Sequence, residues 1–242
     1  MRELLYVPVI HVDSDMGSIA SDIDKRSANI CGEEQWKRHK QSVAIFWDKI
    51  EEYFKKLDAG NLKIYQDGLL ADGELGQKII EEGALRGSRN FRIILDLMGK
   101  GGEIRKTEDV KLLKEEYNRI LKLAQTKSLW ERATAYIGYR IHKDRIMEER
   151  DQFVAATING TLKEKETGVL FMGAFHEVVQ HIAKDINVKE VKNIQKVRDY
   201  FKELISGKNR DKFDQLTECL IADVVNSALV NSGQWTVDSK NH

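Results

Sequence analysis

Short apolar runs alternate along this chain with longer segments of helical periodicity. The runs at 4–12, 61–69 and 168–176 are short and bounded by polar or turn residues, so each predicts a buried strand, and 187–192 predicts a final short one. Pro8 lies inside the first run, which indicates a sheet edge, a strand end or a bulge, because proline cannot donate to a ladder. Since helical segments separate these strands, we expect an α/β fold: a mainly parallel sheet flanked by helices, with a helical insertion or cap in the middle.

The helical segments are recognised by apolar residues spaced three and four apart. They lie at 13–26, 33–60, 73–88, 109–125, 128–166, 177–186, 194–207 and 211–231. The long segment 128–166 is expected to hold more than one helix, with a break at Gly138, whereas 90–104 fits a strand or a short helix equally well. With no repeat and no low-complexity linker, we expect one α/β domain over 1–232, a helical insertion over about 105–150, and a loose tail at 233–242.

Composition excludes several classes of partner. Lys plus Arg equals Asp plus Glu at 39 each, so no global basic field recruits nucleic acid. No apolar run approaches the ~20 residues of a membrane helix, and the first residues lack the pattern of a signal peptide. The two cysteines, Cys31 and Cys219, lie far apart and form no metal-type pair. We therefore expect a cytoplasmic protein with free thiols, no membrane partner and no nucleic acid partner.

Two of the expected strands are followed by histidine. His11 closes the sequence VPVIH, and His176 closes GAFH. Ligands of open α/β sheets bind outside the carboxyl ends of the strands, so parallel strands would bring both histidines to one edge. Acidic residues stand at comparable places: Asp13, Asp15, Asp67 and Glu177. Imidazole and carboxylate groups are common ligands of divalent metals, so this pattern indicates a metal site or a catalytic site.

A purely structural interpretation of the same residues stays open. A histidine after a strand is often a cap or a core residue. Asp13 and Asp15 are typical helix N-cap residues, and an acidic residue such as Glu177 favours the first turn of a helix. Arg150 lies in the charged run EERD, which is typical of a solvated helix face.

The stretch 149–191 resembles the C-terminal core of a superfamily that unites the TraB/Tiki proteins, the ChaN haem-iron-binding proteins and the erythromycin-esterase-like proteins. Those proteins carry an arginine-containing helix, an apolar strand ending in Gly-x-x-His, a helix and a short strand. Arg150, Asp151, Gly173 and His176 fall in that order here. The superfamily also has a first Gly-x-x-His, where this chain has PVIH, with proline in place of glycine. The acid that follows the second strand, usually Glu, would be Asp67.

The resemblance implies a metal-dependent hydrolase acting at the carboxyl edge of the sheet on a small-molecule or peptide substrate. His11 and His176 would bind a divalent metal with Asp67, Asp13 or Asp15. Glu177 or Asp15 would accept the proton of the attacking water, and Arg150 would bind an anionic group or an oxyanion.

The departures from the superfamily pattern at the first histidine motif and at Asp67 keep a second function in view. The chain would then be a non-catalytic ligand-, haem- or metal-binding module, or an oligomeric scaffold that has kept the fold, and a homo-oligomer is compatible with either function.

Overall fold

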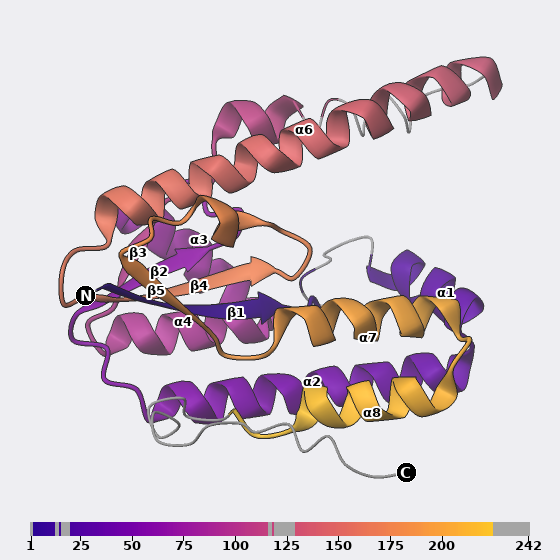
Figure 1. The fold of residues 1–242 in the computed structure, drawn as a ribbon, viewed down its shortest axis with the longest axis horizontal. Helices are drawn as coiled ribbons and strands as arrows, with labels where there is room; N and C mark the ends of the chain where they lie inside the picture. The colour runs from indigo at the N-terminus through magenta and orange to yellow at the C-terminus, as the bar shows by residue number, and fades with distance from the viewer. Residues whose placement is uncertain (1, 13–14, 16–19, 116–117, 119–128, 225–242) are drawn as a thin grey trace, which may run out of the picture.

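The computed structural model describes the chain except residues 1, 13–14, 16–19, 116–117, 119–128 and 225–242, and describes only the backbone of 20–23 and 129–143. Five strands form one parallel sheet in the order β3-β2-β4-β1-β5. Their bounds are Arg2–Val9 (β1), Leu62–Gln66 (β2), Glu103–Arg105 (β3), Thr167–Gly173 (β4) and Ile186–Glu190 (β5). The predicted α/β class and parallel sheet are confirmed (Figure 1).

Helices surround this sheet. They are α1 (Ala20–Cys31), α2 (Glu33–Lys55), α3 (Gly73–Leu85), α4 (Arg89–Gly99), α6 (Leu129–Thr161), the 3-10 helix η3 (Val178–His181), α7 (Ile194–Ser206) and α8 (Arg210–Ile221). In Figure 1, α6 lies along one side of the sheet and its N-terminal half projects away from the body. Helices α2, α4 and α8 lie on the opposite side. Among the described residues, no helix is long and apolar enough to cross a membrane.

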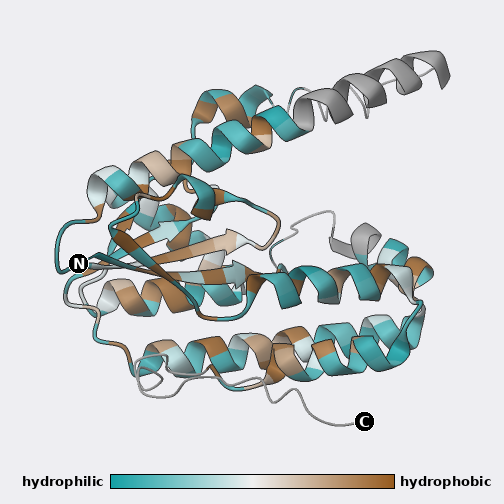
Figure 2. Cartoon of the chain, in the orientation of Figure 1, coloured by the Kyte–Doolittle hydropathy of each residue, from teal (hydrophilic) through white to brown (hydrophobic). Residues whose placement is uncertain are grey.

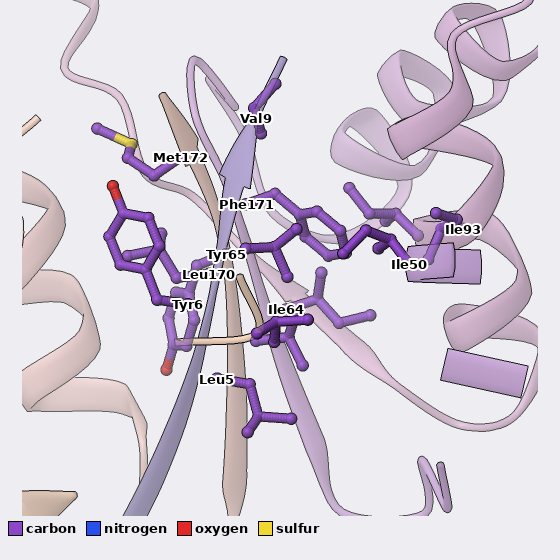
Figure 3. Close-up of a cluster of buried hydrophobic side chains, with 14 of the residues drawn as sticks. Leu5, Tyr6, Val9, Ile50, Ile64, Tyr65, Ile93, Leu170, Phe171 and Met172 are labelled. Carbon is purple, nitrogen blue, oxygen red and sulfur yellow. The ribbon is translucent and has the colours of Figure 1, made fainter. Parts of the chain in front are cut away.

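The strands are buried on both faces because helices cover both. Strand β4 is hydrophobic along its length in Figure 2, as expected for a central strand of a parallel sheet. Alternate side chains divide between two cores, as Figure 3 shows. Phe171 and Ile64 face Ile50 of α2 and Ile93 of α4, whereas Tyr6 lies on the other side of the sheet.

Tyr65 connects that other side to α6. Its hydroxyl lies 2.8 Å from Oγ1 of Thr161, so the last turn of α6 is fixed above the sheet. Pro8 occupies a strand end, one of the predicted positions. Strand β1 pairs with β5 only as far as Tyr6, so the missing N–H of Pro8 costs no hydrogen bond on that side.

Several predicted elements differ in the structure. In the ambiguous segment 90–104, the apolar run is helical and forms α4, and the short strand β3 begins only at Glu103. The break expected at Gly138 is wrong, because α6 runs through it without interruption. The helix predicted at 177–186 is also wrong. Only the four residues of η3 are helical there, because β5 begins at Ile186 and Asn159 of α6 bonds the connecting backbone.

Other predictions fall partly outside the described residues. Helix α1 begins at Ala20, and the expected cap residue Asp13 is not described. Residues 110–115 are helical, as predicted for 109–125, but most of the rest of that segment is undescribed. The helical connection between β3 and β4 extends past the predicted boundary of 150, since α6 ends at Thr161. The tail expected at 233–242 also lies outside the description.

Candidate functional site

The carboxyl ends of β1, β2 and β4 meet at one edge because the three strands are parallel neighbours. Asp67 directly follows β2, and its backbone N–H donates to the carbonyl of Phe171 in β4 at 2.9 Å. His176 follows β4 through a tight turn, in which its N–H donates to the carbonyl of Gly173 at 3.1 Å. The sequence prediction that the ends of these three strands share one sheet edge is therefore confirmed.

The imidazole of His176 is oriented by a buried carboxylate. Nδ1 of His176 lies 2.5 Å from Oδ1 of Asp151 on α6. The other oxygen of Asp151 accepts the backbone N–H of Glu177 at 2.6 Å. The Asp151 side chain is 3% exposed and that of His176 is 10% exposed. Since Asp151 accepts at Nδ1, that nitrogen carries the hydrogen and Nε2 keeps its lone pair.

Nε2 of His176 faces the carboxylate of Asp67. Oδ2 of Asp67 is 3.8 Å from Nε2, which is too long for a hydrogen bond. The position between them adjoins Gly173, where an added Cβ would lie 3.4 Å from the imidazole Cδ2 and 3.9 Å from Oδ2 of Asp67. A glycine here keeps a side chain out of this position.

The second oxygen of Asp67 belongs to a buried ion-pair network. Nη2 of Arg150 lies 3.2 Å from Oδ1 of Asp67 and 2.6 Å from Oε2 of Glu108, and Nε of Arg150 also donates to that oxygen at 3.0 Å. Glu108 follows β3, and its side chain is only 2% exposed. Its other oxygen, Oε1, is buried and has no hydrogen-bond partner in the described part of the chain. Burial raises the pKa of Glu108, and Asp67 adds to this effect while Arg150 opposes it.

Helix α6 therefore contacts the groups that follow β2 and β3 as well as the group that follows β4. Arg150 and Asp151 are consecutive in α6, and they bind the groups that follow β2 and β3 on one side and β4 on the other. The side chains form a chain of contacts in the order Glu108, Arg150, Asp67, His176 and Asp151.

A network of buried polar residues holds the end of β2, directly before Asp67. The amide of Asn90 donates to Gln66 Oε1 at 2.8 Å, and Ser88 donates to Asn90 at 2.6 Å. Thr107 donates its hydroxyl to the carbonyl of Gln66, which joins the loop after β3 to the end of β2. All four side chains are buried, so this network fixes the backbone that presents Asp67.

Arg198 of α7 fastens the turn that carries His176. Its guanidinium donates to the carbonyls of Ala174 and, at 2.9 Å, of His176. It also pairs with the carboxylate of Glu177 at 2.8 Å. On the face of the sheet that α6 covers, the hydroxyl of Tyr6 donates to the carbonyl of Gly173 at 3.1 Å. Burial raises the pKa of Tyr6, and the carboxylates of Asp67 and Asp151 raise it further.

The structure brings three of the predicted site residues together in one series of contacts. His176, Asp67 and Arg150 come together, whereas Glu177 is half-exposed and pairs with Arg198. His11 is also half-exposed and lies 3.7 Å from Asp15. Asp15 also binds the backbone N–H of Val12.

The pKa of His11 is raised by the Asp15 carboxylate, and more weakly by Asp67. Asp13 lies outside the described residues.

The described residues at this sheet edge supply only part of the ligand set that the predicted divalent metal would need. Nε2 of His176 and the carboxylate of Asp67 are chemically suited to it, and Asp151 supplies the carboxylate that commonly orients a metal-binding histidine. In the described ranges, however, no three His, Cys, Asp or Glu side chains come together to hold a metal ion. Oδ1 of Asp67 already accepts from the guanidinium of Arg150, so Oδ2 is the oxygen that faces Nε2 of His176.

A cavity of about 340 Å³ lies elsewhere, between the turn that joins α1 to α2 and the turn that joins α7 to α8. Its lining mixes acidic and basic side chains, including Glu203, Arg38 and Arg210. None of the groups that follow the strands lines it. The chemistry therefore marks the sheet edge rather than this cavity as the candidate site.

Sequence patterns gave no role to Asp151, Glu108, Arg198 or Tyr6, although all four belong to this site. Asp151 appears only as one residue of the resemblance. Glu108 follows a strand of three residues, which no periodicity reveals. Comparison with known proteins adds no further residue, since no protein family, curated sequence or solved structure matches this chain.

Proposed function

We propose that this chain is a hydrolase that acts at the carboxyl edge of its sheet, with His176 as the general base. The observation that carries the proposal is the Asp151–His176 pair, which leaves Nε2 with a lone pair that faces Asp67 beside Gly173. A histidine oriented by a buried carboxylate is a recurrent arrangement for moving protons in acyl transfer. The substrate class that fits is a small ester or amide, including a peptide. The resemblance to the esterase-like superfamily points the same way.

Each step of such a reaction can be assigned to a group in this chain. Nε2 of His176 accepts a proton from the attacking water, whose oxygen bonds to the carbonyl carbon of the substrate. Asp151 and Asp67 stabilise the resulting imidazolium, because both carboxylates face the ring. The imidazolium then donates its proton to the leaving oxygen or nitrogen as the C–O or C–N bond breaks. The histidine therefore returns to its neutral form.

The remaining residues position this pair. Arg150 holds Asp67, and Arg198 and Tyr6 hold the turn from Gly173 to His176.

The two cysteines of the chain, Cys31 and Cys219, are free thiols, which fits the proposed cytoplasmic location. Neither the scaffold alternative nor a homo-oligomer has a comparable observation in its favour.

The test is turnover of a panel of small esters, amides and phosphate esters by the parent, His176→Gln and His181→Gln. We expect the first variant to lose at least 100-fold in kcat/KM, because glutamine cannot act as a base. His181→Gln is the matched control, since His181 lies in the same segment and pairs with Glu148 instead. Equal activity of His176→Gln and the parent would overturn the proposal.

A metal-dependent hydrolase is the second candidate, and the pairing of Nε2 of His176 with Asp67 favours it. In that case these two residues would hold a divalent ion, which would supply an acidified water. Binding to the folded state would raise the melting temperature with ion concentration, and the rise would disappear in Asp67→Asn. Full activity after treatment with a chelator, with no thermal shift in zinc, manganese, cobalt or iron, would exclude it.

A further inference from the structure

Among the residues that the structure describes, the charges around His176 do not balance. The carboxylates of Asp67, Glu108 and Asp151 share one guanidinium, that of Arg150, and all of these groups are largely buried. Glu177 and Arg198 neutralise each other. Asp15 adds a further carboxylate beside His11, and His11 is near enough to Asp67 for that acid also to raise its pKa. Lys106, in the loop after β3, lies over the ring of Phe153 on α6, 5.8 Å from its centroid.

The excess of negative charge persists if one acid is protonated. Burial and Asp67 raise the pKa of Glu108, which favours the protonated form of this acid. Asp67 and Asp151 would then still outnumber Arg150. Burial strengthens their effect, since charges in a partly dehydrated site are screened far less than those on the surface.

Arg150 is therefore not available as an anion-binding group. It donates to Glu108 through Nε and Nη2, and Nη2 also faces Asp67. A phosphate or carboxylate brought to this guanidinium would have to compete with two carboxylates that the fold has already placed there. The role that the resemblance implies for Arg150, binding of an anionic substrate group, is at odds with this geometry.

The carboxylate of Glu108 is a second observation that favours a positive charge or a hydrogen-bond donor at this site. Oε1 is buried and lacks a partner among the described residues, although Oε2 of the same group accepts two hydrogen bonds from Arg150. A buried oxygen with an unused lone pair is costly unless a donor or a positive charge lies near it.

We infer that the site selects substrates that carry a positive charge near the scissile ester or amide bond and rejects substrates that carry a negative one there. The inference rests on the proposed function, because it concerns the ligand of the same site. A cationic group would interact favourably with the excess carboxylate charge, and an anionic group would be repelled by it.

Three matched 4-nitroanilides test the inference. Their acyl groups are butanoyl, 4-(trimethylammonio)butanoyl and succinyl, which are similar in length and carry zero, one positive and one negative charge. We expect kcat/KM to fall in the order cation, neutral, anion, with about tenfold or more between the first and the last at low salt. The ratio should shrink as ionic strength rises.

Two variants separate this effect from other causes. Asp15→Asn removes one charge outside the proposed machinery, and we expect it to lower the cation-to-anion ratio roughly threefold to fivefold. Asp211→Asn removes an acid exposed in the first turn of α8, and it should leave the ratio unchanged. A ratio that does not respond to Asp15→Asn or to salt would overturn the electrostatic cause.

A binding measurement distinguishes failure of the inference from failure of the proposed function. The amides of the three acyl groups, without the nitrophenyl ring, are titrated into the parent while the imidazole resonances of His176 are followed by NMR. Binding in the expected order without turnover would refute the hydrolase and retain the selectivity. Turnover with a preference for the anion would refute the selectivity and retain the hydrolase. Neither binding nor turnover would refute both.

Discussion

Asp151 determines which nitrogen of His176 carries the proton. Its Oδ1 is 2.5 Å from Nδ1, and its Oδ2 is occupied by the N–H of Glu177. In Asp151→Asn, the amide NH₂ would face either Nδ1 or that N–H. The orientation in which the NH₂ donates to Nδ1 favours the tautomer whose hydrogen is on Nε2, and in that tautomer Nε2 cannot act as a base.

We therefore expect Asp151→Asn to lower kcat by about 10²–10⁴-fold with little change in KM. Kinetics on the best substrate of the panel measure both, and ¹⁵N NMR of the imidazole reports the tautomer. Asp144→Asn, an exposed position one to two turns earlier in the same helix, is the control and should match the parent. A wild-type tautomer with wild-type kcat in Asp151→Asn would contradict the role of Asp151.

His176 also contributes to stability, because it shields a buried charge. Its replacement by alanine would leave the 3%-exposed carboxylate of Asp151 with only the N–H of Glu177. Breaking a buried pair of this kind costs about 3 kcal/mol or more. Urea unfolding at pH 7 should show this loss for His176→Ala and a smaller one for His176→Gln, which can still donate to Asp151. Equal stability of the two variants would mean that Asp151 gains nothing from a donor at this position.

The sequence predicts the residues that follow strands better than those that a helix contributes. His176 and Asp67 were found because each stands at the end of an apolar run. Asp151 and Glu108 have no such local signal: one is an ordinary charged residue of a helix, and the other follows a strand of three residues. Their importance arises from tertiary contacts across 25 and 42 residues of sequence, which no local pattern records.

At the scale of elements, α7 controls the turn between β4 and η3. Arg198 bonds two carbonyls of that turn and pairs with Glu177. In Arg198→Ala these carbonyls lose their donors, so we expect the free energy of unfolding to fall by about 1–3 kcal/mol. The turn that carries His176 would also loosen, and kcat should fall about tenfold.

Arg198→Lys and Glu177→Gln identify which contact matters. Lysine keeps the charge but cannot reach two carbonyls with the planar fork of arginine, so it should restore only part of the loss. Glu177→Gln removes only a half-exposed ion pair and should change stability by less than ~1 kcal/mol. Urea unfolding and kcat are measured on all three variants. A larger effect of Glu177→Gln than of Arg198→Ala would contradict the role of the two carbonyl contacts.

The elements that the sequence mispredicted are those where tertiary contacts outweigh local preference. Residues 177–186 have helical spacing, yet the carbonyl of His181 and the N–H of Ala183 bond the side chain of Asn159 instead of forming helical bonds. Gly138 does not interrupt α6, because a single glycine costs a helix only about 1 kcal/mol. The central strands were predicted well because both of their faces are buried, which requires continuous apolar runs.

At the scale of the whole molecule, the strand order places β1, β2 and β4 side by side although they are far apart in sequence. The sequence could predict parallel strands from the alternation with helices, and a shared edge from parallel strands. It could not predict that α6 crosses this edge with Arg150 and Asp151, since the position of a helix over a sheet depends on the packing of both. The covering of the site is therefore a property of the complete fold.

A buried histidine remote from the site links the stability of the whole molecule to pH. His39 of α2 lies 3.0 Å from the hydroxyl of Tyr200 in α7, and its ring stacks on Trp36 with centroids 4.7 Å apart. Tyr200 in turn stacks on Phe213 of α8, so the histidine lies among three helices. Burial lowers the pKa of His39 to about 4, and the charge of Lys40 adds to this effect.

The direction of the pH effect follows from the two states of His39. In the unfolded chain its pKa is about 6.5, so between pH 6.5 and 4 the unfolded state binds a proton that the folded state does not. The stability associated with a neutral His39 is complete above pH 6.5 and is lost as pH falls through this window, by an amount on the order of 3 kcal/mol. Other groups titrate in the same range, so the parent alone does not isolate this contribution.

The difference between the parent and His39→Gln isolates it. Glutamine keeps a polar group beside Tyr200 but does not titrate. The variant should be less stable than the parent at pH 7, because it loses the stacking on Trp36. Its deficit in the free energy of urea unfolding should shrink as pH falls from 6.5 to 4, and the variant should be the more stable protein at the acid end if the deficit at pH 7 is below ~3 kcal/mol. A deficit that stays constant over this range would show that His39 has the same pKa in the folded and unfolded chains, which its burial among three helices does not allow.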